Sequence, residues 1–518
     1  MEADLARNTS LTGEARAAIV GQLRIVLDRE LDVEGAFSDD QWTSWGDIAC
    51  WAEELERQFT EFGIARREPV VLALRNRPSA LAALFGALAE RRPSVLVSAL
   101  HPPAYVRTVT AATDARVIVA DEADCGSALL QQAGELDGGV VALPSAGQTA
   151  GQHRVRVARR PGSHHSDKPI GPEVAMLVPT SGTTGVPKLV HIGWEQLPPG
   201  SPGRPRPPRP PSVRPPIIHA LSMATITGAR GVLGAAMRGR GIAMLERVDV
   251  EAWSRLVERF GVRRAGLPPA AMRMMLDQRI PPARLASLDA WVTGSAPLDP
   301  VLQVEFEDYF GVPVLLAYGS TELGGPVATW TPELHREWSR RKLGSAGRAS
   351  EGAELRVVSE STGEPLGPDD VGILTVRRRG DRSVGDRGGA WIRTSDRARI
   401  DSDGFVFIAG RVDDVIIRGG NKVSLGEVEE VFARHPAVRD AGAVDLADRR
   451  LGQVPAVAVV LRAGQSATPE ELRAWARERL VPYKVPALIR IVAELPMGGS
   501  HKVNRGELRK ILREVAGG

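Results

Sequence analysis

The sequence predicts an α/β fold with a large N-terminal region of several subdomains, residues 1–410, and a small α+β domain, residues 411–518. Three observations lead to this prediction. The chain has 518 residues, more than one hydrophobic core normally accommodates. Helical and strand patterns alternate over roughly the first 120 residues, which favours parallel-rich sheets covered by helices. Beyond about residue 410, short amphipathic helices accompany isolated apolar strands, which indicates a separate domain.

The first helix with a clear start signal begins near Ser44, with Asp47 three residues later. Its apolar stripe, Leu55, Phe59 and Phe62, ends at Gly63, a residue that suits a helix terminus. The elements expected next are a buried strand at Val70–Leu74, a helix at Ala80–Glu90, and strands at Val95–Leu100 and Arg116–Ala120.

One segment interrupts the alternation. Residues 198–216 are dominated by proline and contain Arg204, Arg206, Arg209 and Arg214 but no acidic residue. Proline prevents a helix or an inner strand, so we expect a flexible, extended and solvated loop. We favour the interpretation that this loop is a plain insertion. The alternative is that it binds an acidic or aromatic-lined partner.

The C-terminal domain is predicted from three elements. Glu427–Phe432 has the pattern of a short amphipathic helix, and Ala456–Leu461 is an apolar strand. Thr468-Pro469-Glu470-Glu471 carries a helix cap, a first-turn proline and a capping-box glutamate. The stripe of that helix is expected to be Leu472, Trp475, Ala476 and Leu480.

Composition excludes several classes of protein. The net charge is +3 and the basic residues are scattered, which argues against a nucleic-acid partner. Cys50 and Cys125 are the two cysteines, and they suit neither a disulfide framework nor a metal site. The start lacks an apolar signal core, and no stretch approaches the roughly 20 apolar residues of a membrane span. We therefore expect a cytoplasmic protein without membrane insertion.

The most informative motif is a turn of hydroxyls, glycines and one lysine between two apolar runs. Glycines let backbone N–H groups approach phosphate oxygens, hydroxyls donate further hydrogen bonds, and lysine supplies positive charge. A solvated Ser/Thr/Gly loop is the alternative. The residues that would wrap a polyphosphate are Thr180, Ser181, Gly182, Thr183, Thr184, Gly185 and Lys188.

A second motif follows the apolar stretch Val312–Ala317. Its residues are Tyr318, Gly319, Ser320, Thr321 and Glu322. The tyrosine ring suits stacking on adenine, and a glutamate oxygen suits Mg²⁺. Further on, Asp396 lies in Arg393-Thr394-Ser395-Asp396, where its carboxylate could accept hydrogen bonds from ribose hydroxyls. A third block, Lys502-Val503-Asn504-Arg505, lies near the end of the chain.

Taken in this order, the blocks resemble the adenylate-forming superfamily of acyl-CoA synthetases, nonribosomal peptide synthetase adenylation domains and luciferases, with acyl-CoA ligases closest. The resemblance covers nearly the whole chain. It implies that a carboxylic acid reacts with ATP and Mg²⁺ to give an acyl-adenylate, and that the thiol of coenzyme A or of a carrier-protein pantetheine then displaces AMP. It also implies that the small C-terminal domain is mobile and rotates between the two steps.

Residue roles follow from the resemblance alone. Lys502, Lys188 and Glu322 match catalytic positions, with Lys502 bridging carboxylate and α-phosphate and Glu322 binding the metal. Further ATP contacts match Ser295, Ala296, Pro297, Asp396 and Arg411. The hinge matches Asp413, and the coenzyme A tunnel matches Arg418, Gly419 and Gly420. The acyl pocket would involve Thr225, Gly228, Gly294 and Tyr318.

The chain departs from the family pattern at several positions. Ala224 and Thr225 stand where acyl-CoA ligases have an aromatic residue and a histidine, and His219 lies nearby, more plausibly packed or solvated than a replacement. Residues 222–228 contain no aspartate to hold an ammonium group, so a free amino acid is disfavoured as substrate. His501 replaces the glycine expected before the late lysine. Ser395 and Ile373 are further departures.

The sequence therefore predicts an ATP-dependent ligase that joins a non-amino-acid carboxylic acid to coenzyme A. One alternative is a specialist in a single half-reaction: an acyl-AMP ligase that loads a carrier protein, or an enzyme that makes a thioester from preformed acyl-AMP. Another is a non-catalytic protein that binds a nucleotide or an acyl ligand. The identity of the acid and the presence of a homodimer are left open.

Overall fold

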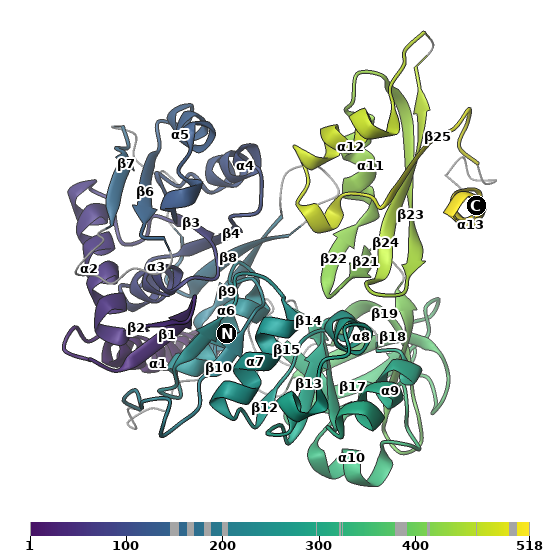
Figure 1. Ribbon diagram of the computed structural model, residues 1–518, viewed down its shortest axis with the longest axis horizontal. Coiled ribbons are helices and arrows are strands. Elements are labelled where there is room, and N and C mark those ends of the chain that lie inside the picture. Colours follow the sequence, from purple (N-terminus) through teal and green to yellow (C-terminus); the bar gives the residue numbers. More distant parts are fainter. Residues whose placement is uncertain are drawn as a thin grey trace. The chain divides into compact units, whose positions relative to one another are not determined.

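The computed structural model describes residues 2–145, 155–162, 170–180, 188–198, 206–296, 298–320, 323, 325–378, 391–411, 415–462, 464–496 and 505–516. Its contacts divide the chain into two compact units. Unit 1 comprises residues 1–180, 187–265 and 283–288, and unit 2 comprises residues 181–186, 266–282 and 289–518. Figure 1 shows the helices and strands of both.

A seven-stranded sheet in the order β7-β6-β5-β3-β4-β8-β9 forms the centre of unit 1. Its inner strands β6, β5, β3, β4 and β8 run parallel, and the edge strands β7 and β9 are antiparallel to their neighbours. The strands are β3 (Val70–Leu74), β4 (Ser94–Ser98), β5 (Val117–Asp121), β6 (Gly139–Leu143), β7 (Arg156–Arg159), β8 (Val174–Thr180) and β9 (Lys188–Gly193). The parallel sheet predicted from the alternating pattern is confirmed.

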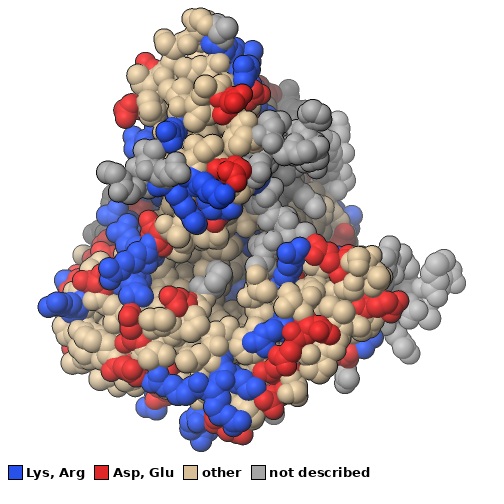
Figure 2. All heavy atoms as spheres, turned by 90° about the vertical axis from the view of Figure 1, so that its right-hand side faces the viewer, with Lys and Arg blue, Asp and Glu red and all other residues tan. Residues whose placement is uncertain are grey.

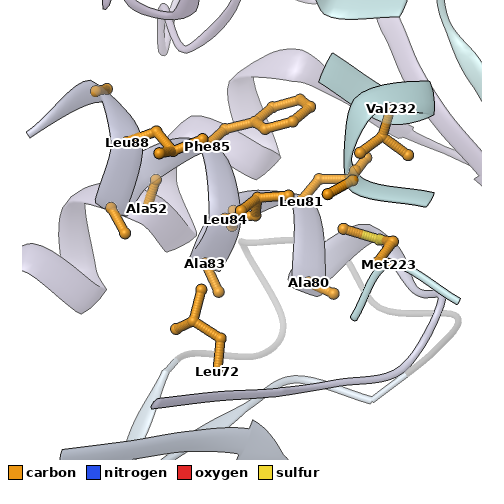
Figure 3. Packing of buried hydrophobic residues seen from close by; sticks show 14 of the residues in the cluster. Ala52, Leu72, Ala80, Leu81, Ala83, Leu84, Phe85, Leu88, Met223 and Val232 are labelled. Atoms are coloured by element: carbon orange, nitrogen blue, oxygen red, sulfur yellow. The ribbon is translucent and has the colours of Figure 1, made fainter. Parts of the chain in front are cut away.

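Helices cover this sheet and bury its side chains. They are α1 (Glu2–Val26), α2 (Trp45–Glu61), α3 (Pro78–Ala89), α4 (Pro103–Thr113) and α5 (Ser127–Gly134). Every residue of α3 is buried, and Figure 3 shows Leu72 on one side of this helix and Ala52 of α2 on the other. A Cβ on Gly86 would lie 2.9 Å from Cβ of Ala52, so a glycine permits this close helix packing. The predicted cap is present, since the backbone N–H of Asp47 donates to Ser44 Oγ over 3.0 Å.

A smaller sheet in unit 1 has the order β10-β11-β1-β2. Its strands are β1 (Glu34–Ser38), β2 (Gln41–Ser44), β10 (Ile217–His219) and β11 (Ile242–Met244), and the helices α6 (Ile226–Ala236) and α7 (Val250–Phe260) follow β10 and β11. Phe37, Trp42 and Phe260 pack together with ring centroids 5.2 to 5.7 Å apart. Aromatic packing of this kind fixes the sheet against α7.

The Pro/Arg-rich segment is described from residue 206 onward, and residues 206–216 contain neither helix nor strand, as proline predicts. The segment is nevertheless anchored on unit 1. The N–H of Arg206 donates to Gln22 Oε1 of α1 over 3.0 Å, and Gln22 Nε2 donates back to the Arg206 carbonyl over 2.7 Å. Composition alone did not reveal this docking.

Unit 2 contains α8 (Pro269–Asp277) and strands of a mixed sheet with the order β13-β14-β15-β16. The elements are β13 (Ala290–Gly294), α9 (Pro300–Phe310), β14 (Val314–Ser320), β15 (Gly325–Thr329), α10 (Pro332–Trp338) and β16 (Arg348–Ala349), whereas β12 (Arg264–Ala265) belongs to unit 1. An antiparallel sheet follows, with β17 (Ala353–Val358), β18 (Gly372–Arg378), β19 (Ile392–Ile400) and β20 (Val406–Arg411) in sequential order.

The last part of unit 2 is the α+β domain expected from the sequence. Its sheet has the order β22-β21-β24-β23, with β25 parallel to β24. The elements are β21 (Val415–Arg418), β22 (Asn421–Ser424), α11 (Leu425–Ala433), β23 (Val438–Asp448), β24 (Gly452–Leu461), α12 (Pro469–Arg477), η4 (Pro482–Lys484), β25 (Leu488–Ile491) and α13 (Arg505–Ala516). The capping box of α12 is present, with Thr468 Oγ1 and Glu471 as partners. The boundary at residues 410 and 411 stays a prediction.

Two properties of the surface bear on partners. Among the described residues, no helix is both long enough and apolar enough to cross a membrane. On the face shown in Figure 2, acidic and basic side chains are interspersed rather than separated into large patches of one sign.

Candidate active site

The predicted phosphate-binding turn connects β8 to β9. Thr180 and Lys188 are opposite each other in the antiparallel pair, so the motif connects the paired ends of the two strands. Because β8 is parallel to β4, the motif follows the carboxyl end of an inner strand, where α/β sheets commonly bind ligands. Ser181, Gly182, Thr183, Thr184 and Gly185 lie outside the described residues, as do the side chains of Thr180 and Lys188.

Two predicted nucleotide contacts lie side by side in unit 2. Tyr318 of β14 donates from Oη to Asp396 Oδ2 of β19 over 2.5 Å, although 78 residues separate them in the sequence. Both side chains are half-buried. In the β19–β20 register, Asp396 lies opposite Arg411, whose side chain is outside the described part. Three of the predicted ATP residues are therefore neighbours.

The Asp396 backbone is also held in place. Its N–H donates to Thr394 Oγ1 over 3.1 Å, and the same hydroxyl donates to the Leu374 carbonyl of β18 over 2.8 Å. This short chain of hydrogen bonds orients the carboxylate toward Tyr318. A fixed carboxylate loses little conformational entropy when it accepts hydrogen bonds from a ligand.

Glycines set the backbone spacing around Tyr318. A Cβ on Gly319 would lie 2.2 Å from the Gly325 carbonyl oxygen, and one on Gly294 would lie 2.5 Å from that of Ala317. Neither position accommodates a side chain. Ser320 ends β14, whereas Thr321 and Glu322 lie outside the described residues.

Ser295 and Ala296 form the turn after β13. In the parallel register Gly294 lies opposite Ala317, so this turn follows β13 at the same sheet edge to which Tyr318 belongs. Ser295 has a φ of 66°, a left-handed conformation that costs a non-glycine residue about 1 kcal/mol or more. Strain of this kind often accompanies ligand sites. Pro297 lies outside the described residues.

Thr225 and Gly228 stabilise the N-terminus of α6. Thr225 Oγ1 accepts from the Gly228 N–H over 3.1 Å and donates to the Ser222 carbonyl over 2.8 Å. A Cβ on Gly228 would lie 2.0 Å from that carbonyl oxygen. Both residues therefore have local structural roles that the sequence did not reveal. Their place in an acyl pocket stays a prediction; these two belong to unit 1, and Gly294 and Tyr318 belong to unit 2.

His219 is a packed histidine, as expected. Its side chain is buried at the end of β10, beneath Gly231 of α6. Burial lowers the pKa of His219 to about 4, and a hydrogen bond with the backbone of Leu221 opposes this shift in part. The ring is therefore neutral near pH 7.

The predicted thiol-side turn joins β21 to β22. Gly419 and Gly420 have φ values of 54° and 88°, and a Cβ on Gly420 would lie 2.9 Å from Cγ of Pro268, just before α8. Arg418 does not extend freely from this turn, because its Nη1 donates to the carbonyls of Tyr483 and Val485 over 2.9 Å each. Asp413 lies outside the described residues.

A hollow that the sequence analysis missed lies near this turn. It has a volume of about 420 Å³ and is lined by Asp277, Asp448, Arg449 and Arg450. The N–H of Gly419 donates over 2.8 Å to the carbonyl of Leu451, the residue that follows Arg450. Asp448 Oδ1 accepts the N–H groups of Arg450 and Leu451, which shapes the tip of the β23–β24 hairpin. In the sequence, the signal that could have indicated this hollow is the pair of consecutive arginines, Arg449 and Arg450.

Lys502 and His501 lie outside the described residues, but the helix that follows them is well anchored. Leu508 and Leu512 of α13 are buried against the sheet of the C-terminal domain. Arg505 Nη2 lies 3.1 Å from Glu429 Oε1 of α11. Glu429 also accepts the Ala443 N–H over 2.8 Å. No local sequence pattern marks Glu429 for this role, because its partner is 76 residues away.

The described residues contain no cluster of three or more His, Cys, Asp or Glu side chains arranged for a metal ion. This is compatible with Mg²⁺ bound by one carboxylate and by phosphate oxygens of a substrate, which is how Mg²⁺ is commonly held. The carboxylate predicted for that role, Glu322, is not described.

Comparison with known proteins identifies the family. Residues 23–381 match the family described as AMP-binding enzyme, and residues 427–502 match the AMP-binding enzyme C-terminal domain. The chain is 29% identical over 480 residues to a 2-succinylbenzoate–CoA ligase of Geobacillus kaustophilus, covering 90% of this chain and 91% of the relative. It is 27% identical over 511 residues to 4-coumarate–CoA ligase 5 of Oryza sativa subsp. japonica, covering 93% and 91%.

Solved structures give the same fold. An amide bond synthetase from Marinactinospora thermotolerans superposes with a TM-score of 0.75 at 24% identity, covering 95% of this chain and 99% of that one. An o-succinylbenzoate CoA synthetase from Bacillus subtilis superposes with a TM-score of 0.72 at 22% identity, covering 95% and 98%. At these identities the likeness concerns the fold alone.

Proposed function

This chain belongs to the AMP-binding enzyme family and is an ATP-dependent acid–CoA ligase, and from that premise we propose its substrate class and the roles of its residues. The acid is an aromatic carboxylic acid without an α-amino group. Relatives named for 2-succinylbenzoate and 4-coumarate support an aromatic acid. The absence of aspartate from residues 222–228 supports the lack of an ammonium group.

The first step joins the acid to AMP. A carboxylate oxygen attacks the α-phosphorus of ATP, the bond to the β-phosphate breaks, and pyrophosphate leaves. The acid is its own nucleophile, so the protein mainly brings two anions together and stabilises the charge that develops at phosphorus. We assign the phosphates to the turn from Thr180 to Lys188, and the carboxylate and α-phosphate to Lys502. Mg²⁺, held with ATP by Glu322, would neutralise phosphate charge.

The nucleoside is assigned to the cluster in unit 2, and this cluster is the observation that carries the proposal. The Tyr318 ring is fixed by its hydrogen bond to Asp396 and offers a face for adenine. The second carboxylate oxygen of Asp396 and the neighbouring Arg411 suit the ribose. The strained turn at Ser295 and Ala296 would cover the other face of the base.

The second step transfers the acyl group to sulfur. The thiolate of coenzyme A attacks the acyl carbon, and AMP leaves with the oxygen that came from the acid. Two features support coenzyme A as the acceptor. The Gly419-Gly420 turn packs closely on Pro268 and Leu451 and presents bare backbone, along which a pantetheine arm could bind. Beside it, Arg449 and Arg450 line the 420 Å³ hollow together with Asp277 and Asp448, and the two guanidinium groups suit the phosphates of coenzyme A.

The test separates the two steps in Lys502→Ala. We expect acid-dependent exchange of pyrophosphate into ATP to fall at least about a hundredfold, because a preorganised charge is lost at the reacting phosphate. Formation of acyl-CoA from supplied acyl-AMP should survive. Lys510→Ala is the matched control, since Lys510 is an exposed lysine of α13 paired with Glu507. Loss of both steps would assign Lys502 to folding, and unchanged exchange would refute its catalytic role.

A further inference from the structure

The Pro/Arg-rich segment brings arginines of two chain regions together on unit 1. Arg209 donates its backbone N–H to the Gly239 carbonyl over 3.1 Å, and Arg240 Nε donates to the Pro215 carbonyl over 2.8 Å. Arg214 Nη1 donates to the carbonyl of Arg238 over 3.0 Å. Together with the pair between Gln22 and Arg206, these bonds fix the segment along the turn between α6 and β11.

The resulting arginine cluster consists of Arg206, Arg209, Arg214, Arg238 and Arg240. The guanidinium groups of Arg206, Arg214, Arg238 and Arg240 repel one another, with no compensating acid among the described residues. Partial burial lowers the pKa of Arg238, and repulsion from Arg214 and Arg206 lowers it further. The pKa of Arg240 is lowered by burial and then by Arg238 and Arg214. Within the described residues, no carboxylate pairs with any member of the arginine cluster.

Several other arginines of unit 1 lie beside a carboxylate. The distance is 2.6 Å from Arg75 Nε to Asp124 Oδ2 and 2.7 Å from Arg92 Nε to Glu56 Oε2. It is 2.6 Å from Arg284 Nη1 to Glu251 Oε1. Like charges held close together destabilise a fold unless an anion neutralises them. Specific hydrogen bonds hold the residues of the arginine cluster in place. This arrangement indicates that an anionic partner completes it.

The surroundings of the cluster favour an acidic protein over other polyanions. Val213 is 67% exposed at the turn of the same segment, so an apolar contact lies among the charges. Protein interfaces combine an apolar centre with arginine, whereas single-stranded nucleic acid is bound by exposed aromatic rings. The segment 206–216 contains no aromatic residue. One exposed valine is also little for insertion into a membrane surface.

We propose that the arginine cluster and Val213 form a docking surface for an acidic protein segment in which carboxylates flank an apolar side chain. Planar guanidinium groups match carboxylates in two-pronged hydrogen bonds. Val213 supplies the desolvated contact at the centre. This surface is distinct from the residues assigned to catalysis, so its occupation concerns partner recruitment rather than the chemical step.

The test uses a fluorescent peptide of alternating glutamates with two central leucines, and anisotropy measured over a salt series. Arg214→Glu/Arg238→Glu should weaken binding at least about tenfold, because attraction becomes repulsion. The matched control Arg67→Glu/Arg247→Glu changes the same charge at two exposed arginines of unit 1 and should leave binding unchanged. Val213→Ser should weaken binding without changing its salt dependence.

Three outcomes would overturn the proposal: no binding by the unaltered protein, equal loss in both double variants, or tighter binding of duplex DNA or anionic phospholipid vesicles than of the peptide. Circular dichroism checks that each variant is folded. Arg238→Gln, which removes one charge without reversing it, gives a milder second variant and should weaken binding by a smaller factor.

Discussion

His219 shows how burial decides the charge of a single side chain. The ring is enclosed between β10 and α6, and its pKa of about 4 lies below the ordinary value of 6.5. Between these two pH values the unfolded chain binds a proton that the folded chain does not. The contribution of the neutral His219 ring to the free energy of unfolding is therefore fully present above pH 6.5. It is lost progressively as the pH falls toward 4.

We predict that His219→Gln makes unfolding less sensitive to acid. Between pH 6.5 and pH 4.5, the free energy of unfolding of the unaltered protein should fall by about 2 kcal/mol more than that of the variant. Urea unfolding at the two pH values measures this difference. Parallel pH profiles would show that His219 titrates in the folded protein as it does in the unfolded chain.

Single residues also show what the sequence could not reveal. Thr225 and Gly228 suggested an acyl pocket because the family lines its pocket there, yet their side-chain and backbone contacts are those of a helix start. A glycine that admits a carbonyl oxygen and a glycine that makes room for a ligand look identical in a sequence. The distinction depends on a neighbour, Ser222, whose position is set by the fold.

At the scale of elements, α13 joins the region of the late lysine to the rest of its domain. Its apolar side is buried through Leu508 and Leu512, and its first residue, Arg505, is paired with Glu429 of α11. Lys502 precedes this anchored residue by three positions in the sequence. The pair therefore holds the residue at which α13 begins.

We predict that Glu429→Gln loosens the start of α13. Hydrogen exchange of the first-turn amides should become about fivefold faster, corresponding to about 1 kcal/mol for a partly exposed ion pair. Glu430→Gln is the control, because Glu430 of α11 pairs with Arg434, the residue that caps the end of α11, and not with α13. Equal exchange rates in the two variants would show that Arg505 does not hold the helix.

Elements marked by local chemistry were predictable. The Ser44 cap, the Thr468 capping box and the buried strand at Val70–Leu74 are all present. Local signals sufficed because caps and apolar runs act within a few residues. The docking of residues 206–216 and the Glu429–Arg505 pair depend on contacts between distant parts of the chain, and no local pattern encodes them.

At the scale of the whole molecule, the residues assigned to ATP are distributed along most of the chain. The hairpin of β8 and β9 belongs to unit 1, and Tyr318, Asp396 and Arg411 are neighbours in unit 2. Reading the motifs in order predicted the family correctly, and the family match over residues 23–381 confirms it. The acid itself was not predictable, since pocket shape depends on side chains that no motif specifies.

The central claim is that the acid is activated as an acyl-adenylate, and isotope transfer tests it most directly. An aromatic acid that supports pyrophosphate release is labelled with ¹⁸O in its carboxylate and converted with ATP and coenzyme A. Because the carboxylate oxygen that attacks the α-phosphorus leaves with AMP, mass spectrometry should find one ¹⁸O in each AMP formed. Acyl-CoA formed with unlabelled AMP, or with the label in pyrophosphate or inorganic phosphate, would contradict the account.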